Sequence, residues 1–336
     1  MTRFAFFLAI MMLFAACNGD SRHPNLSKID VKLETERFER DFFRIDTNNV
    51  AAGLAALRNA HPAFYGDYMT EILGINPGDS IGAFVVRRMI HDYRPIYDSL
   101  ELKYRNFDDV RKELEKGYRY VKYYYPEYNV PKRLVTFIGP LDAQWVALNT
   151  DYVAVGLQVF GGKHFSLYQS PDLQQMYPWY ISRRFDKEYV APTAMKAVVN
   201  ELYPDMSTGR PLLEQLVEKG KQLYLLDHLL PDADDSLKTG FTGAQHKFIE
   251  RNEGNIWSQL LRDENLYSVD PSTLQTYIGE APFTQGLPED APGNLGPWLG
   301  WRIVQAYAKR NDKKTLKEIL ALPAKTIYEE SRYRPK

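Results

Sequence analysis

RLVTFI, at residues 133–138, is the stretch that decides the fold of this chain. It is a continuous run of apolar and β-branched residues closed by a Gly-Pro pair, and such a run predicts a buried strand. Residues 144–148 and 152–160 repeat the pattern on either side of a polar Asn-Thr-Asp turn, which is typical of a β-hairpin. We therefore expect a small antiparallel or mixed sheet in the middle of the sequence.

Outward from this centre the periodicity is helical in both directions. Apolar residues recur at spacings of three and four, and capping residues, glycines and prolines separate the segments. One early strand is expected at residues 29–33, where apolar and polar residues alternate. Helices are expected at residues 47–59, 62–73, from 79 onward, 108–125, 171–185, 190–202, 210–229, 242–263, 296–310, 313–321 and 323–332. The predicted fold class is α+β, mostly α-helical, in a single domain around a small central sheet.

The beginning of the sequence has the layout of a lipoprotein signal. Residues 4–16 are continuously apolar, Arg3 precedes them, and Cys17 follows two alanines. The run is too short to span a membrane, which takes about 20 apolar residues, and an ordinary cleaved signal leaves Cys17 unexplained. Two or more acyl chains on one residue, palmitate among them, give stable anchoring in a lipid bilayer. We expect a lipoprotein signal peptide at residues 1–16, a lipidated tether at 17–27 and a globular domain at 28–336.

Composition excludes several classes of function. The formal net charge is −1, so no basic field is available to attract nucleic acid. Cys17 is the only cysteine of the chain, so a lipidated product has no thiol left for disulfides, thiol catalysis or cysteine-based metal sites.

Local catalytic motifs are missing from the sequence. No two of the six histidines lie three or four residues apart, and no H-E-x-x-H, G-x-S-x-G or P-loop pattern occurs. The acidic residues 232–236 do not fit an EF-hand, because the required glycine and bidentate glutamate are absent from the frame. Glu201, Glu214 and Glu218 are available as paired carboxylates for glycoside cleavage, although carboxylates on helices are mostly solvated. We predict no catalytic residue, no metal site and no cofactor.

Two aromatic clusters remain. Residues 118–125 mix tyrosines with cations and either stack a ligand or lie over the core at one helix end. Trp298 and Trp301 flank an apolar helix face, so they either pack in the core or line a groove with Arg302. Gly300 between them costs a helix about 1 kcal/mol relative to alanine, which indicates a close backbone contact at that point.

Taken together, several segments resemble the gliding-motility lipoprotein B family (GldB) of the bacterial envelope. The resemblance covers nearly the whole mature length and is densest in the C-terminal half. The segments are residues 156–162 with Tyr168, 180–185 with 189–192, 216–221 with Tyr224, 252–257, 281–283 and 298–304.

That family is in turn similar to predicted zinc peptidases with a zincin-like helix-and-sheet scaffold. In those relatives an H-E-x-x-H helix follows the hairpin, and a later glutamate completes the metal site. Here residues 191–200 contain neither histidine nor glutamate, Lys196 would repel a cation, and Glu218 stands about where the third ligand would be. The resemblance therefore implies a pseudo-peptidase: a zincin-like domain without its metal, whose groove serves binding. The candidate binding residues are Glu218, Trp298, Trp301 and Arg302.

Three functions follow as hypotheses. The first is a lipid-anchored, non-catalytic envelope protein that binds a protein partner in a gliding or secretion apparatus, on the periplasmic face of the outer membrane. The second is a divergent hydrolase with an atypical site. The third is a lipoprotein that binds glycan or peptidoglycan through the aromatic clusters.

Overall fold

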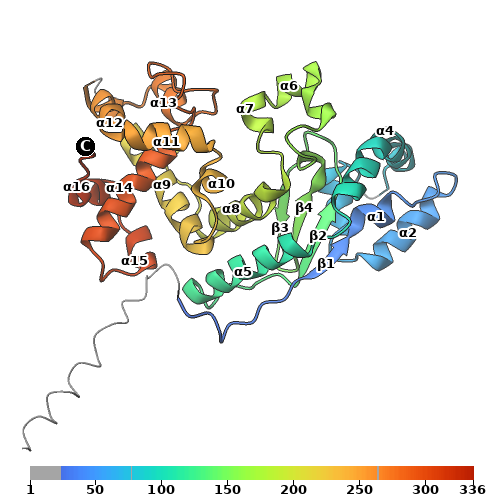
Figure 1. Cartoon of the computed structure of the whole chain (residues 1–336). Helices are drawn as coiled ribbons and strands as arrows, with labels where there is room; N and C mark the ends of the chain where they lie inside the picture. The colour runs from blue at the N-terminus through green and yellow to red at the C-terminus, as the bar shows by residue number, and fades with distance from the viewer. Residues whose placement is uncertain (1–23, 77, 263–264) are drawn as a thin grey trace, which may run out of the picture.

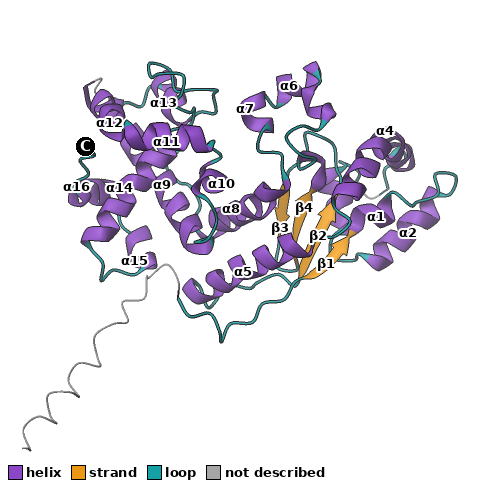
Figure 2. Cartoon of the chain, viewed as in Figure 1, coloured by secondary structure: helices purple, strands orange, loops and turns teal. Residues whose placement is uncertain are grey.

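The computed structural model describes residues 24–76, 78–262 and 265–336. Helices make up most of the described chain, and the strands form one four-stranded sheet (Figure 2). The fold class is therefore α+β, as the sequence predicts.

The sheet is mixed, in the order β1-β2-β4-β3. β1 (Glu34–Arg37), β2 (Arg133–Phe137) and β4 (Tyr152–Gly156) run parallel, and β3 (Val146–Leu148) is antiparallel to β4. The predicted strand at 133–138 and the hairpin after it are confirmed. β4 is shorter than expected because Leu157–Val159 form a 3-10 turn (η2). In that turn the buried Gln158 accepts a hydrogen bond from the backbone N–H of Gly139 at 3.1 Å.

The early strand was expected at the wrong residues. Residues 29–33 alternate in polarity but pair with no strand, and the edge strand is the charged segment Glu34–Arg37. Its Glu36 forms an ion pair with Arg133 of the neighbouring strand at 2.7 Å. A charged edge strand discourages pairing with other chains. Pairing with β2, rather than the alternation of apolar and polar residues, therefore decides which residues form the edge strand.

Aromatic packing joins the first helices to the sheet. Tyr68 donates a hydrogen bond to the carbonyl of Ile138 at 2.8 Å, and its ring lies against Phe64 and Phe137. The helices before β2 are α1 (Phe38–Phe42), α2 (Val50–Ala60), α3 (Tyr65–Asp67) with the π-helical η1 (Tyr68–Ile72), α4 (Gly82–Lys103) and α5 (Asp108–Tyr124).

The helices after the sheet build the other half of the molecule. They are η3 (Ser166–Gln169), α6 (Pro171–Met176), α7 (Trp179–Ser182), η4 (Lys187–Tyr189), α8 (Val190–Leu202), α9 (Leu212–Leu229), α10 (Asp235–Thr239), α11 (Gly243–Arg251), α12 (Glu253–Arg262), η5 (Asn265–Tyr267), α13 (Pro271–Ile278), α14 (Gly296–Arg310), α15 (Leu316–Leu320) and α16 (Ala324–Ser331). The helix expected at 171–185 is two helices, because Pro178 cannot continue the first one. The helix expected at 242–263 also divides, at Asn252.

Two clusters of buried apolar side chains support these halves. One surrounds the sheet, and the other lies among α9, α14 and α16. α9 contributes its first half to the second cluster and its last turns to the first. In Figure 1, α5 and α8 lie between the sheet and the C-terminal helices, and they contact α9.

α9 and α14 cross at backbone contact distance. A Cβ atom on Gly300 would lie 1.7 Å from the carbonyl oxygen of Leu216, and one on Gly220 would lie 2.1 Å from the carbonyl carbon of Gly300. Only glycine fits at either position. The close backbone contact expected at Gly300 is therefore confirmed, and the crossing fixes where α14 begins relative to α9.

Candidate functional site

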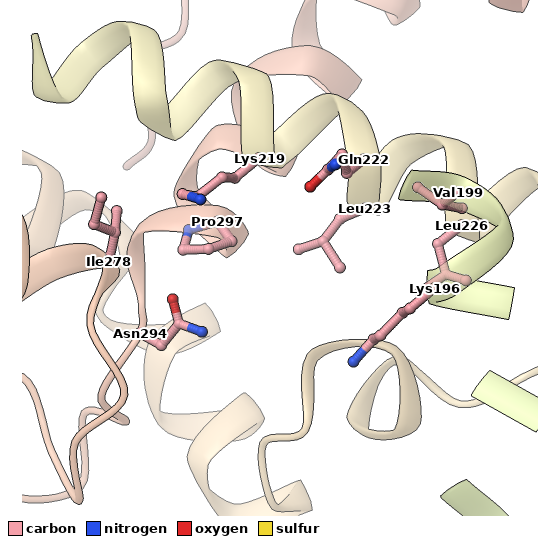
Figure 3. Close-up of a pocket in the computed structure, with 9 residues that line it drawn as sticks. All are labelled: Lys196, Val199, Lys219, Gln222, Leu223, Leu226, Ile278, Asn294 and Pro297. Atoms are coloured by element: carbon pink, nitrogen blue, oxygen red, sulfur yellow. The ribbon is translucent and has the colours of Figure 1, made fainter. Parts of the chain in front are cut away.

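A cavity of about 260 Å³ opens beside the α9–α14 crossing (Figure 3). α8 and α9 form one side of it, and the end of α13 and the start of α14 form the other. Its residues are Lys196, Val199, Lys219, Gln222, Leu223, Leu226, Ile278, Asn294 and Pro297. The lining is thus mostly apolar with a few polar ends, the usual character of a ligand-binding pocket.

Lys196 is the most unusual group in this cavity. Its side chain extends from α8 into the open space (Figure 3), and it has no hydrogen bond or ion pair with any residue of the described chain. Burial, and to a smaller extent the nearby Arg184, lower the pKa of its ammonium from 10.5 to about 8, although Glu280 opposes the change. The cavity wall therefore presents a partly exposed ammonium that no other described residue pairs with.

Two arginines lie near Glu280, and one of them, Arg184, is also near Lys196. The Arg184 guanidinium forms an ion pair with Glu280 at 3.1 Å. Arg183 donates to the carbonyl of Gly240 at 3.0 Å, and burial together with Arg184 lowers its pKa. The Nε atoms of both arginines are buried and lack a hydrogen-bond partner within the described ranges. One carboxylate thus faces three cations.

Asn294 lies opposite Lys196 in the cavity (Figure 3). Its backbone is left-handed, with φ 56°, a conformation that asparagine tolerates better than most residues. Its Oδ1 atom is buried and accepts no hydrogen bond from the residues described. Its Nδ2 atom lies 3.5 Å from Glu280, at the limit of a hydrogen bond. The amide is therefore only partly satisfied by the protein.

Glu218, a candidate binding residue that stands about where the third metal ligand of the relatives would be, does not line this cavity. Its two carboxylate oxygens accept from the Lys221 ammonium at 2.8 Å and from the Tyr203 hydroxyl at 2.5 Å. Lys221 is 1% exposed and also donates to the carbonyl of Leu322 at 2.6 Å. Burial and the neighbouring Glu218 both raise the pKa of Tyr203. This cluster joins the end of α8 to α9 and to the loop before α16.

The structure places Trp298 and Trp301 in the second core, 3% and 2% exposed. Neither ring offers a surface to a ligand from solvent, which agrees with the core-packing alternative rather than with a groove. Arg302 lies at the edge of this core, with its guanidinium over the Trp298 ring at 5.9 Å and paired with Glu253 at 3.0 Å. The candidate residues from the sequence are therefore separated into two structural clusters.

The tyrosine cluster at 118–125 also lies largely in the core. Tyr118 and Tyr120 are 0% and 4% exposed, while Tyr123 is 45% exposed. Nothing in the described ranges brings three His, Cys, Asp or Glu side chains together as a metal site would require.

Sequence reasoning identified Lys196 only as a residue that would repel a metal ion. The cavity around it was missed because its walls come from α8, α9 and the segment before α14, which only the tertiary fold brings together. One signal was available: the sequence predicts a helix that begins at residue 296, and the structure confirms that α14 begins at Gly296, beside the cavity.

A family model described as gliding motility protein GldB matches residues 19–335. The chain belongs to this family. Neither a curated protein nor a solved structure matches it. Membership makes the protein a gliding-motility-associated lipoprotein, which associates it with the cell envelope. In the part of the chain that the structure describes, no helix has both the length and the apolar character of a membrane span.

Proposed function

We propose that this protein is a lipid-anchored, non-catalytic component of the gliding apparatus that binds a protein partner in the envelope. Cys17 is the proposed lipidation site, after a signal peptide at residues 1–16, and residues 17–27 are the proposed tether to a domain at 28–336. Cys17 and the signal peptide lie outside the described residues. The outer membrane, on its periplasmic face, is the proposed location.

The fold is proposed to be a zincin-like scaffold that has lost its metal chemistry. On that alignment α8 replaces the metal-binding helix, and the charged residue that it places in the cavity wall is Lys196. An ammonium at that position repels a cation. It supports a binding role for the cavity.

The non-catalytic role is supported mainly by the hydrogen bonds and the ion pair that the Glu218 carboxylate already makes. Its carboxylate already accepts from Lys221 and Tyr203, and Lys221 is buried, so the two charges neutralise each other. A zinc site for hydrolysis needs three protein ligands and an open position. A carboxylate used to neutralise a buried lysine is not available as one of them.

Metal analysis of the full chain, purified in detergent, tests this role. We expect far less than one equivalent of zinc or manganese, and no cleavage of a casein substrate after either metal is added. Stoichiometric metal that is lost in Glu218→Gln, together with metal-dependent peptide cleavage, would favour the divergent hydrolase instead.

Partner binding is tested by crosslinking in cells. A photoreactive residue at Gln222, in the cavity, should crosslink a discrete envelope protein that a photoreactive residue at the exposed Lys313 does not. If neither position, nor positions on other faces of the domain, yields a specific crosslink, the partner-binding role is contradicted.

A further inference from the structure

Positive charge in and around the cavity is not balanced by the protein. Lys219, in the lining, is paired with Asp205 at 2.7 Å, and Arg184 is paired with Glu280. Lys196 and Arg183 have no carboxylate partner in the described parts of the chain. The Lys196 side chain is only partly buried on the wall of the open cavity, so a ligand can reach its ammonium. An anion is the kind of ligand that would complement this charge.

Two further features of the cavity favour an anion with an oxygen-rich head. α14 begins at the cavity with Gly296 and Pro297, and no side chain caps its first turn. Pro297, the α14 residue in the lining, has no N–H to donate, but the positive end of the helix dipole at this terminus stabilises negative charge. The Asn294 amide, opposite Lys196, supplies a donor that the protein satisfies only weakly.

The other residues of the cavity wall indicate the chemical character of the rest of the ligand. Val199, Leu223, Leu226 and Ile278 are apolar, so the part of the ligand that lies away from Lys196 must be apolar too. The volume, about 260 Å³, is small and accepts a group of side-chain size rather than a long chain. A phosphate or sulfate group requires more hydrogen-bond donors than one free ammonium and one amide provide. A single carboxylate matches them.

We propose that this cavity binds a carboxylate carried on a short aliphatic body, with the head at Lys196 and Asn294 and the body against α9. Such a group occurs as a free short-chain acid and as the C-terminal residue of a polypeptide. The inference deepens the binding role proposed above, and it rests on that role only in assigning the cavity to binding.

Calorimetric titration of the full chain in detergent with 4-methylpentanoate tests the proposal at pH 7. We expect saturable binding of the acid, binding weaker by roughly tenfold or more for the neutral 4-methylpentanamide, and a similar loss in Lys196→Met. Lys247→Met, at an exposed lysine of α11, is the matched control and should bind as the unmodified chain does. Equal binding of acid and amide, or no binding of either at millimolar concentration, overturns the proposal.

A second measurement needs no variant. Reductive methylation followed by peptide mass spectrometry reports the reactivity of each lysine amine. 4-Methylpentanoate should protect Lys196 and leave Lys247 unchanged, whereas equal reactivity of Lys196 with and without the acid contradicts the proposal even if Lys196→Met fails to fold.

The source of the carboxylate is decided by a peptide. A trialanyl-leucine peptide with a free C-terminus should bind more tightly than 4-methylpentanoate if the ligand is a chain end, and its C-terminal amide should bind weakly. A peptide that fails to bind while the free acid binds assigns the site to small acids. Neither result depends on metal content, so failure here is distinguishable from failure of the non-catalytic role.

Discussion

Replacing Gly300 with alanine should destabilise the C-terminal half of the molecule far more than one methyl group suggests. The added Cβ would lie 1.7 Å from the carbonyl oxygen of Leu216, whereas real Cβ atoms essentially never approach within 3.0 Å. The obstacle is backbone, so no rotamer change relieves it, and α9 and α14 must separate by roughly 1 Å. A gap of that size forfeits about a quarter to a half of the dispersion energy of the contacts it opens.

The magnitude follows from two opposing effects. Overpacking of a core costs about 1–3 kcal/mol and occasionally more, and a contact between two backbones belongs at the upper end. Alanine in place of glycine returns at most about 1 kcal/mol of helix propensity. We expect the free energy of unfolding to fall by about 2–3 kcal/mol, with a fall in Tm of several degrees.

Urea and thermal unfolding followed by circular dichroism measure this effect. Gly243→Ala is the matched control, because a Cβ there meets nothing within 4 Å, and it should leave stability unchanged or raise it slightly. Gly220→Ala should resemble Gly300→Ala, and the double variant should lose less than the two single losses combined, because the first substitution already separates the helices. A Gly300→Ala protein as stable as the Gly243→Ala protein would refute the crossing geometry.

Three further predictions concern charged groups and the anchor. Since the pKa of Lys196 falls from 10.5 when unfolded to about 8 when folded, the unfolded chain binds more protons between these values. The free energy of unfolding should therefore rise from pH 8 to pH 10.5 by at most about 3 kcal/mol. Lys196→Met should remove this rise and be more stable at pH 7. An equal rise in both proteins would show that Lys196 does not cause it. Glu218→Gln should lower the free energy of unfolding by about 3 kcal/mol, because it leaves the ammonium of Lys221 buried without a counter-charge. Urea unfolding measures this loss. A loss below 1 kcal/mol, on the order of one surface ion pair, would show that Lys221 does not depend on the charge of Glu218. Cys17→Ser should move the protein from the membrane pellet to the soluble fraction, and a variant that still resists extraction of peripheral proteins would contradict lipid anchoring.

The sequence predicted correctly those helices and strands that are determined by their own residues. The strand at 133–137 is apolar and bounded by turn residues, and the helices at 190–202 and 296–310 were predicted with the bounds that the structure has. Predictions failed where a distant partner decides the outcome. The charged Glu34–Arg37 is a strand because β2 pairs with it, although nothing in its own pattern indicates one.

The candidate site divides in the same way. Gly300 was noticed because glycine is unfavourable within a helix, so one local anomaly indicated one close contact. Trp298 and Trp301 carry no signal that distinguishes a buried aromatic from a binding one, and the structure places both in the core. Lys196 gains its meaning only from Arg184 and Asn294, which lie on other segments of the chain.

The pairing of β1 with β2 has a consequence for how the chain reaches this structure. Glu34 pairs with Arg133, so β1 cannot join the sheet until α1 to α5 and β2 have all been made. Contacts between such distant residues form slowly, because closing a long loop costs entropy before any contact repays it. We therefore expect β1 and the helices that follow it to remain exposed to proteases and chaperones until β2 is available to pair.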